Sequence, residues 1–421
     1  MKLNKDRAVI TLLLVVFADA MSFAMIMPIL PFLVLKSGGG SRTGGELISI
    51  HALGTLIAAP LLGKLSDRYG RYRILLWTNV GAFLAHAFLG FSTNVLALFT
   101  ARAVAGLMAG NISVVMATIA DRTPKSSRAG NMGLVMTAWA VGVVLGPGLG
   151  LLGIHLFPDS AGMVVGLQAA MFSLICIALV FYSLSNLTRR SETASPSSAP
   201  GFFSAARGKG WLLIQSLLVS VCQSALVSML AFWVHDTFGW GGKEVSILMI
   251  WVAVIIAAVQ ALCVTPLSRV LGNFGAIIAG TAASALCSAA MMLLLGSSAA
   301  LIALAPLIVC GLTVAMTLLN TIMSNLSSAD EQGASLGVLS SSSGLGRVIG
   351  PTCGGLMLHG YGARGLLLFS ILLCSIVCWW SVLKARNHTD RERLNAVLAP
   401  DHSSSSSYVQ EFMREGPRLD E

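Results

Sequence analysis

The chain has 421 residues, of which 55% are hydrophobic and only 11% are charged, and its formal net charge is +9. Soluble domains carry about 25% charged residues, so these few charges cannot cover the surface of a soluble protein of this length. The composition therefore excludes a soluble globular protein and predicts a membrane protein.

Polar clusters divide the apolar sequence into twelve stretches long enough to cross a bilayer. This pattern predicts an all-α polytopic membrane protein with twelve transmembrane helices. The predicted spans are 8–35, 45–62, 74–95, 97–120, 130–155, 161–185, 211–235, 244–266, 274–297, 299–326, 333–359 and 363–385. The first span is too long for a removable signal peptide and lacks a small-residue cleavage site, so we expect it to remain in the protein.

Basic residues fall mainly on one side of these spans. With the N-terminus inside, the segments on the cytoplasmic side contain 21 Lys and Arg residues and the outer loops contain 4. An excess of Lys and Arg marks cytoplasmic loops, so both termini are predicted to be cytoplasmic. The net charge reports topology and gives no reason to expect a nucleic-acid partner.

Asp19, in the first span, is the acidic residue that lies deepest in the predicted membrane. The other 17 of the 18 acidic residues fall in loops, tails or span ends. Asp19 lies about eleven residues into the span, which is roughly 16 Å deep in a helix. A carboxyl group in a low-dielectric site holds its proton more tightly and can exchange it near neutral pH. We therefore interpret Asp19 as a proton-coupling residue; a permanent hydrogen bond or ion pair is the alternative.

The loop between the second and third spans contains four basic residues and one acid within Gly63–Arg73. Glycines allow tight turns, and a carboxylate can pair with an arginine or sit at a helix N-terminus. We expect a cytoplasmic gate here; a basic loop that only obeys the topology rule is the alternative. The expected gate residues are Gly63, Asp67, Arg68, Gly70 and Arg71. The corresponding stretch of the second half, 266–272, contains no acid.

A glycine pattern in the fifth span recurs in the eleventh span with a constant offset of 204 residues. The matched residues are Gly133, Gly142, Gly146, Pro147 and Gly150 in the first copy, and Gly337, Gly346, Gly350, Pro351 and Gly354 in the second. Glycines spaced four apart let another helix approach closely, so we expect helix-packing sites. The repeat predicts two homologous six-helix bundles, as in transporters, with a substrate site between them.

The repeat also sets the expected domain boundaries. We predict an N-terminal bundle over 1–185, a cytoplasmic linker over 186–210, a C-terminal bundle over 211–385 and a disordered cytoplasmic tail over 386–421. The linker is rich in Ser and Pro, which is typical of flexible connections. The tail is polar and contains a run of serines, which is typical of disorder.

Polar side chains inside the spans are candidates for a substrate cavity. They are Arg347, Asn111, Gln223 and Asn320, with Gln260, His51 and His86 at similar depth. Arg347 takes the place of Val143 in the first half, and a charge at mid-depth costs about 2.5 to 3.5 kcal/mol unless it faces a cavity or a partner. We expect Arg347 to meet an anionic group of the substrate or to form an ion pair. For the uncharged residues, hydrogen bonding between helices is the alternative.

These motifs resemble the major facilitator superfamily and, within it, the drug:proton antiporters with twelve spans. The loop Gly63–Arg73 is similar to the family's loop signature, and Arg102 with Gly106 and Gly110 is similar to its fourth-span motif. The fifth-span glycines match the antiporter motif, except that Leu151 replaces a second glycine. The resemblance implies that Arg102 tunes the proton affinity of Asp19; a structural ion pair is the alternative.

The first span, from Asp19 to Pro31, is similar to that of tetracycline/proton efflux proteins, which carry an acid in their third span where this chain has Ala85-His86. The resemblance implies proton-coupled efflux of a small organic molecule by alternating access. An exporter of an anionic metabolite or siderophore-like compound, or a transporter-like sensor or scaffold, are the alternatives.

The sequence contains no nucleophile with a nearby base, no nucleotide-binding loop and no cluster with metal-ligand spacing. We therefore do not expect an enzyme, a metal site or a cofactor, and the proton gradient is the expected energy source. We expect a functional monomer in a bacterial inner membrane, with the substrate, protons and the lipid bilayer as its partners.

Overall fold

The computed structural model describes residues 2–123, 125–184, 208–328 and 331–398, and these ranges are predominantly helical. The first half comprises α1 (Lys2–Ile26), α2 (Leu30–Lys36), α3 (Ser41–Tyr69), α4 (Arg71–Gly90), α5 (Val95–Met108), α6 (Asn111–Arg122), α7 (Lys125–Leu156), the 3-10 turn η1 (Pro158–Ser160) and α8 (Ala161–Leu184). The second half comprises α10 (Gly210–Phe238), α11 (Gly242–Leu262), α12 (Val264–Leu293), α13 (Ser298–Asn325) and α14 (Gln332–Leu398).

Twelve membrane helices account for these elements, so the predicted fold class is confirmed. The described residues contain ten helical stretches that are long and apolar enough to cross a membrane, and the stretch Gln332–Arg386 holds two of the predicted spans. It reverses at Gly362, whose φ of +61° is open to glycine at little cost. The twelfth helix is α4, which contains the buried polar side chains of Thr78, Asn79 and His86.

Two predicted spans are each built from two helices. In the first span α1 ends at Ile26 and α2 begins at Leu30, because Pro28 and Pro31 lack the amide hydrogens that a continuous helix needs. In the fourth span α5 and α6 are separated at Ala109 and Gly110. These interruptions place non-helical backbone inside the bundle, which is tolerated in membranes where it is covered by protein or lines a cavity.

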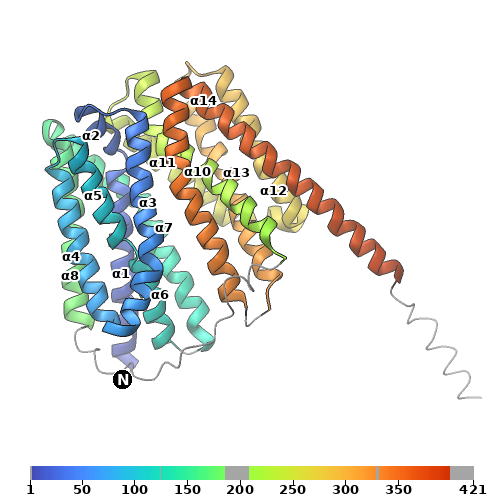
Figure 1. Ribbon diagram of the computed structural model, residues 1–421, viewed down its shortest axis with the longest axis horizontal. Helices are drawn as coiled ribbons and strands as arrows, with labels where there is room; N and C mark the ends of the chain where they lie inside the picture. The colour runs from blue at the N-terminus through green and yellow to red at the C-terminus, as the bar shows by residue number, and fades with distance from the viewer. Residues whose placement is uncertain (1, 124, 185–207, 329–330, 399–421) are drawn as a thin grey trace, which may run out of the picture.

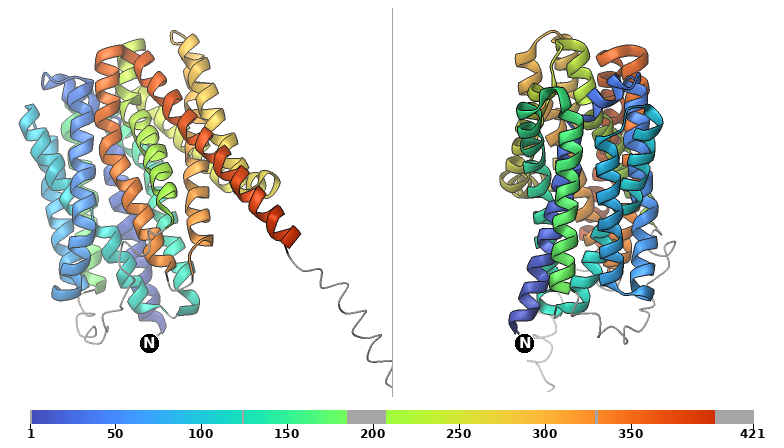
Figure 2. Two further views of the ribbon diagram at one scale, coloured as in Figure 1. Left: turned by 45° about the vertical axis from the view of Figure 1, so that its right-hand side comes forward. Right: turned by 90° about the vertical axis from the view of Figure 1, so that its left-hand side faces the viewer.

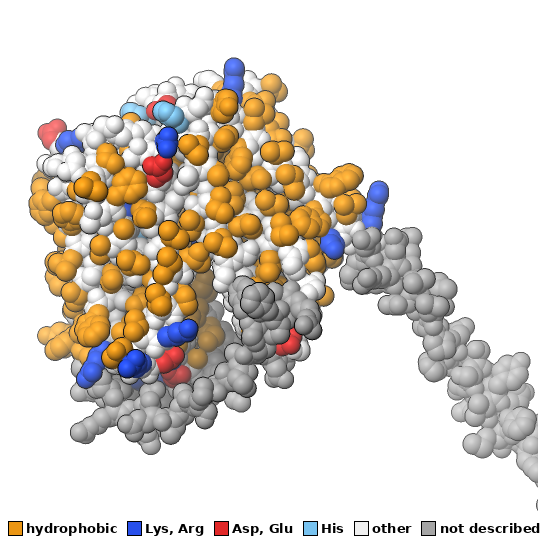
Figure 3. Space-filling view, in the orientation of Figure 1, with side chains coloured by type: hydrophobic (Ala, Val, Ile, Leu, Met, Phe, Trp, Pro, Cys, Tyr) orange, Lys and Arg blue, Asp and Glu red, His pale blue; other side chains and the backbone are white. Residues whose placement is uncertain are grey.

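The two halves stand side by side, with α1 to α8 on the left and α10 to α14 on the right of Figure 1. We call the side that holds the N-terminus the N-terminal side and the opposite one the far side. Contacts between the halves join the first part of α3 to the middle of α14, and Gly148 of α7 to Ile250 of α11. On the N-terminal side the ribbons diverge (Figure 2) and the surface is hollowed between them (Figure 3).

The repeated glycines pack helices together within each half. A Cβ added to Gly142 of α7 would lie 2.5 Å from the carbonyl oxygen of Phe17 on α1, and one at Gly350 of α14 would lie 2.5 Å from the carbonyl oxygen of Val221 on α10. The same close approach holds for Gly146, Gly150, Gly346 and Gly354. Equivalent helix pairs are thus built by equivalent glycines, as the 204-residue repeat predicts.

Gly133 corrects one part of this prediction. It is exposed, and a Cβ there would meet no atom within 4 Å, as at its counterpart Gly337. Both lie near the starts of their helices, on the N-terminal side where the elements diverge. The regular spacing of the glycines predicted a helix contact at Gly133, but the close packing begins only at Gly142.

This difference gives a matched pair of substitutions. Gly142→Ala should lower the thermal stability of the purified protein, because overpacking of a close contact costs roughly 1–3 kcal/mol. Gly133→Ala makes the same chemical change in the same helix where there is room, and should leave the melting temperature unchanged or slightly raised. Melting curves in detergent compare the two; an equal loss in both variants would contradict the packing assignment.

Two predicted segments fall largely outside the described residues. Of the linker 186–210, only Gly208, Lys209 and the first residue of α10 are described, and 399–421 of the tail are not. The first part of the tail differs from the expectation of disorder, since α14 continues as helix to Leu398. This stretch, residues 386–398, contains no Gly or Pro that would end the helix.

Candidate functional site

Asp19 lies on α1, which packs against α6, α7 and α8 of the first half, and its side chain is half-buried. Among the described residues it makes no hydrogen bond or ion pair, and no salt bridge joins it to Arg102. The alternative of a carboxylate held permanently by a partner is therefore not what this conformation shows. A carboxyl group without a partner is free to gain or lose a proton.

Arg102 of α5 lies close to α1 and contacts an aromatic ring there. Its side chain is only 1% exposed, its guanidinium carbon lies 5.9 Å from the ring centre of Phe23, and its Nε and Nη2 atoms have no hydrogen-bond partner in the described structure. The opposite face of the cluster is formed by His51 of α3, whose ring stacks on Phe23 at 5.3 Å. The buried guanidinium of Arg102 therefore lies beside the stacked rings of Phe23 and His51, and no carboxylate among the described residues pairs with it.

His86 belongs to the same half and faces α8. Its Nδ1 is 3.1 Å from the hydroxyl oxygen of Ser173, and both side chains are buried. Next to it, the hydroxyl of Ser22 on α1 donates to the carbonyl of Ala18 and to that of Ala169 on α8. These hydrogen bonds form a polar layer that joins α1, α4 and α8 around the level of Asp19. Such a layer can accommodate the charge of Asp19 better than a purely apolar core.

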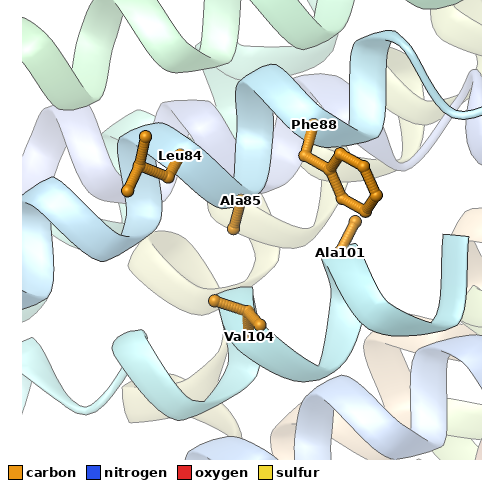
Figure 4. Close-up of a pocket in the computed structure, with 5 residues that line it drawn as sticks. All are labelled: Leu84, Ala85, Phe88, Ala101 and Val104. Atoms are coloured by element: carbon orange, nitrogen blue, oxygen red, sulfur yellow. The ribbon is translucent and has the colours of Figure 1, made fainter. Parts of the chain in front are cut away.

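A shallow apolar groove opens beside this layer, on the outer surface of the bundle. It has a volume of about 190 Å³ and lies between α4 and α5 (Figure 4). Its lining is Leu84, Ala85, Phe88, Ala101 and Val104. The next residues in sequence, His86 and Arg102, point inwards and are buried. The groove offers no polar group and suits lipid chains, so we do not assign it to a polar substrate.

Arg347 of α14 is exposed although it lies on a packed helix. Gly346 and Gly350 on one flank pack against α10, and Gly344 and Gly355 on the other flank pack against α3. At 100° per residue, Arg347 lies between these two contact faces, so its side chain enters the space between the halves. It forms no hydrogen bond or ion pair with the described residues. Arg347 therefore remains a candidate for the substrate cavity.

The uncharged candidates divide into two groups. The half-buried Gln223 of α10 donates to Thr313 of α13 at 2.9 Å, and Gln260 of α11 donates to Thr317 of α13 at 3.0 Å. Both bonds join different helices, as in the alternative of interhelical hydrogen bonding. Asn320 instead bonds the carbonyl of Met316 on its own helix. The partly exposed side of α13 therefore carries a row of polar groups in the second half.

Asn111 does not share a site with these residues. It is 1% exposed at the start of α6, and both its amide nitrogen and its amide oxygen lack a hydrogen-bond partner in the described structure. It follows the interruption between α5 and α6 in the first half. The structure thus places Asn111 in the interior of the first half, apart from Gln223, Asn320 and Arg347.

The predicted gate residues form a cluster at the N-terminal side. Arg71 pairs with Asp67 at 2.6 Å and with Asp121 of α6 at 3.2 Å, and it donates to Ser66. Gly70 joins α3 to α4 with a φ of +93°. Arg68 lies over the ring of Tyr69, and a Cβ at Gly63 would meet no atom within 4 Å. In this conformation these ion pairs and hydrogen bonds all join residues of the first half.

Sequence reasoning missed several members of these sites. Asp121 escaped notice because it is fifty residues from Arg71 in sequence. Thr313 and Thr317 escaped notice because threonine hydroxyls commonly bond their own helix, which both also do here. The second half has a similar turn at Gly272, whose φ is +70°. Ser268 donates to Asn273 across this turn, whereas at the gate the corresponding serine, Ser66, accepts from Arg71.

Comparisons with known proteins agree with this architecture. The tetracycline resistance protein of class G from Vibrio anguillarum is 29% identical over 345 residues, which is 80% of this chain and 87% of that protein. The class E protein from Escherichia coli is 27% identical over 356 residues, 82% of this chain and 86% of that protein.

Solved structures share the fold. A bacterial homologue of the human lysosomal transporter Spinster, in an inward-facing and unoccupied conformation, superposes with a TM-score of 0.72 at 17% identity and covers 92% of this chain and 98% of that one. The sequence profile described as Major Facilitator Superfamily matches residues 12–334 and 311–413. Profile, relatives and twelve-helix architecture agree, and the chain belongs to the Major Facilitator Superfamily.

Proposed function

We propose that this chain exports a small organic molecule in exchange for protons. Membership of the superfamily supports membrane transport, and the two relatives described above carry names that describe tetracycline resistance. Export of a drug-like molecule follows from that similarity. Protons are the proposed energy source, and one chain is the proposed functional unit.

Proton coupling is inferred from the environment of Asp19. It is a carboxyl group inside a membrane helix, half-buried and without a hydrogen bond or ion pair among the described residues. Ionisable residues within spans commonly mark proton relays. Arg102 lies in the same half with open guanidinium donors, and its positive charge favours loss of the proton whenever Asp19 approaches it.

Alternating access is the proposed means of transport. The halves are in contact on the far side and diverge on the N-terminal side (Figure 2). With both termini in the cytoplasm, as the distribution of basic residues predicts, this is an inward-facing conformation. The closely packed glycine pairs keep each half rigid, so the two halves can rock as bodies about the space between them.

An anionic or zwitterionic substrate is the second element of the proposal. Arg347 lies between the two packed flanks of α14 and has no partner among the described residues. An arginine binds carboxylate or phosphate oxygens in a bidentate manner. An exporter of an anionic metabolite or siderophore-like compound is therefore favoured by this residue over an exporter of lipophilic cations.

Proteoliposomes test the proposed function. The purified protein, reconstituted with a defined pH gradient, should accumulate a labelled substrate against its concentration gradient, and collapsing the pH gradient with an ionophore should stop the accumulation. A panel of matched anionic, zwitterionic and cationic compounds identifies the substrate class. Accumulation that persists without any pH gradient would rule out proton coupling.

The gate cluster gives a separate prediction. Asp67→Asn or Arg71→Ala should slow transport several-fold while leaving substrate affinity unchanged, because both residues lie on the rim and outside the space around Arg347. Global stability should hardly change in Asp67→Asn, since exposed ion pairs contribute only about 0–1 kcal/mol, and the Asp67 side chain is 64% exposed.

Arg73→Ala is the matched control for the gate. Arg73 is exposed on the same turn and carries the same charge as Arg71. Transport rates and equilibrium binding, measured on the same preparations, separate the two effects. Normal transport in Asp67→Asn and in Arg71→Ala would show that the cluster is not a gate.

A further inference from the structure

Hydrogen bonds between the two halves converge on one hydroxyl group, that of Ser49 on α3. It donates to the carbonyl oxygen of Val348 on α14 at 2.6 Å, and it accepts from the backbone N–H and the hydroxyl of Thr352 at 3.1 and 2.7 Å. A hydroxyl has one hydrogen and two acceptor lone pairs, so the hydrogen-bonding capacity of Ser49 is fully used. Its side chain is buried in the contact.

The two backbone groups bound by Ser49 belong together. Val348 and Thr352 are four residues apart, so their carbonyl and amide are the acceptor and donor of one turn of α14. Pro351 lies next to this turn and lacks the amide hydrogen that would bind the carbonyl of Arg347. A proline and an inserted side-chain group are both recognised causes of helix bending. α14 is thus weakened beside Arg347, and Ser49 holds it there.

The symmetry-related contact lacks this device. Val144 and Gly148 of α7 correspond to Val348 and Thr352 through the 204-residue repeat. There the neighbour from the other half is apolar, because a Cβ at Gly148 would lie 3.7 Å from the Cδ1 atom of Ile250 on α11. One interface between the halves therefore carries a specific polar bond, while its counterpart has an apolar contact that can slide.

We propose that Ser49 is a positioning residue, which holds the far side closed and fixes the helical turn of α14 next to Arg347. When the far side opens, the hydroxyl leaves α14, the carbonyl of Val348 and the amide of Thr352 can bond only within the helix, and the direction of Arg347 changes. Release of Ser49 thereby couples opening to the residue that faces the substrate. The inference rests on the alternating access proposed above.

Distance measurements test this role without substrate or proton gradient. Spin labels at Lys36 and His359, which are exposed near the far side of different halves, report the opening in a background without the native cysteines. Ser49→Ala should increase the ratio of open to closed far side about tenfold, because it removes hydrogen bonds made only in the closed state. Ser49→Thr keeps the hydroxyl and should retain the closed distribution.

Ser220→Ala is the matched control. Ser220 is also buried and donates to a backbone carbonyl of α14, that of Ser343 at 2.7 Å, but within one half. It should lower the melting temperature and leave the distance distribution unchanged. If Ser49→Ala folds poorly, Thr352→Val, which removes one bond and preserves shape, should shift the distribution in the same direction by a smaller amount.

Two results would overturn the inference in distinguishable ways. Equal distributions in wild type, Ser49→Ala and Thr352→Val, with a second distance population present in all three, would show that Ser49 does not position the halves although alternating access holds. A single distance population in the wild type across pH values and substrate concentrations would refute alternating access itself, and with it the inference.

Discussion

Asp19→Asn is expected to abolish accumulation driven by a pH gradient. The amide has nearly the size of the carboxyl group and resembles its protonated form, but it cannot release a proton. Asp19 has no hydrogen bond or ion pair among the described residues, so the substitution breaks no observed contact and the protein should fold normally. Uphill transport should fall to background, whereas downhill exchange of substrate across the membrane should persist.

Asp159→Asn is the control for this experiment. It makes the same chemical change at an exposed position in the turn η1, between α7 and α8, and should leave transport unaffected. Uptake of labelled substrate with and without a pH gradient, together with proton movement reported by a pH-sensitive dye, measures coupling and exchange separately. Uphill accumulation at the wild-type rate in Asp19→Asn would remove Asp19 from the coupling mechanism.

The fold was predictable because its signals are periodic and repeated. Twelve apolar stretches define the helices, and glycines at a constant offset define two similar halves. The exact contacts depend on how each helix is rotated and where it diverges from its neighbour. Gly133 shows this limit: its spacing fits the packing motif, but it is exposed and a Cβ there would meet no atom within 4 Å.

The candidate sites were predictable where a charged residue lies within an apolar membrane span. Asp19 and Arg347 are charges within apolar sequence, and no structure is needed to notice them. Ser49 and Asp121 could not be found in this way, because serine is common in membrane helices and Asp121 lies at a helix end. Their importance arises from partners far away in sequence, such as Val348 and Arg71.

The second large effect is expected at Arg347 and concerns the charge of the substrate. If its side chain meets the substrate in the space between the halves, anionic ligands should bind more tightly than cationic ligands of the same shape. Hydrogen bonds to charged groups contribute about 1.5–3 kcal/mol, which corresponds to roughly a tenfold to hundredfold change in affinity. Arg347→Ala should therefore reduce binding of an anionic ligand by about that factor.

Lysine at this position distinguishes recognition from simple charge. It keeps the positive charge but loses the planar, bidentate geometry of the guanidinium, so Arg347→Lys should weaken anion binding markedly without restoring cation binding. Arg364→Lys, at an exposed arginine just after the turn at Gly362, is the matched control and should have no effect. Titration calorimetry with paired anionic and cationic ligands provides the affinities.

A different outcome would assign Arg347 to another role. If the arginine braces the helices or neutralises Asp19 elsewhere in the cycle, both substitutions should impair expression or proton coupling regardless of the ligand's charge. Its exposed position and the absence of an ion pair among the described residues argue against bracing in the present conformation. Equal or tighter binding of the cationic ligand by the wild type would refute an anion site, because a cation gains nothing from a guanidinium that lacks a counter-charge.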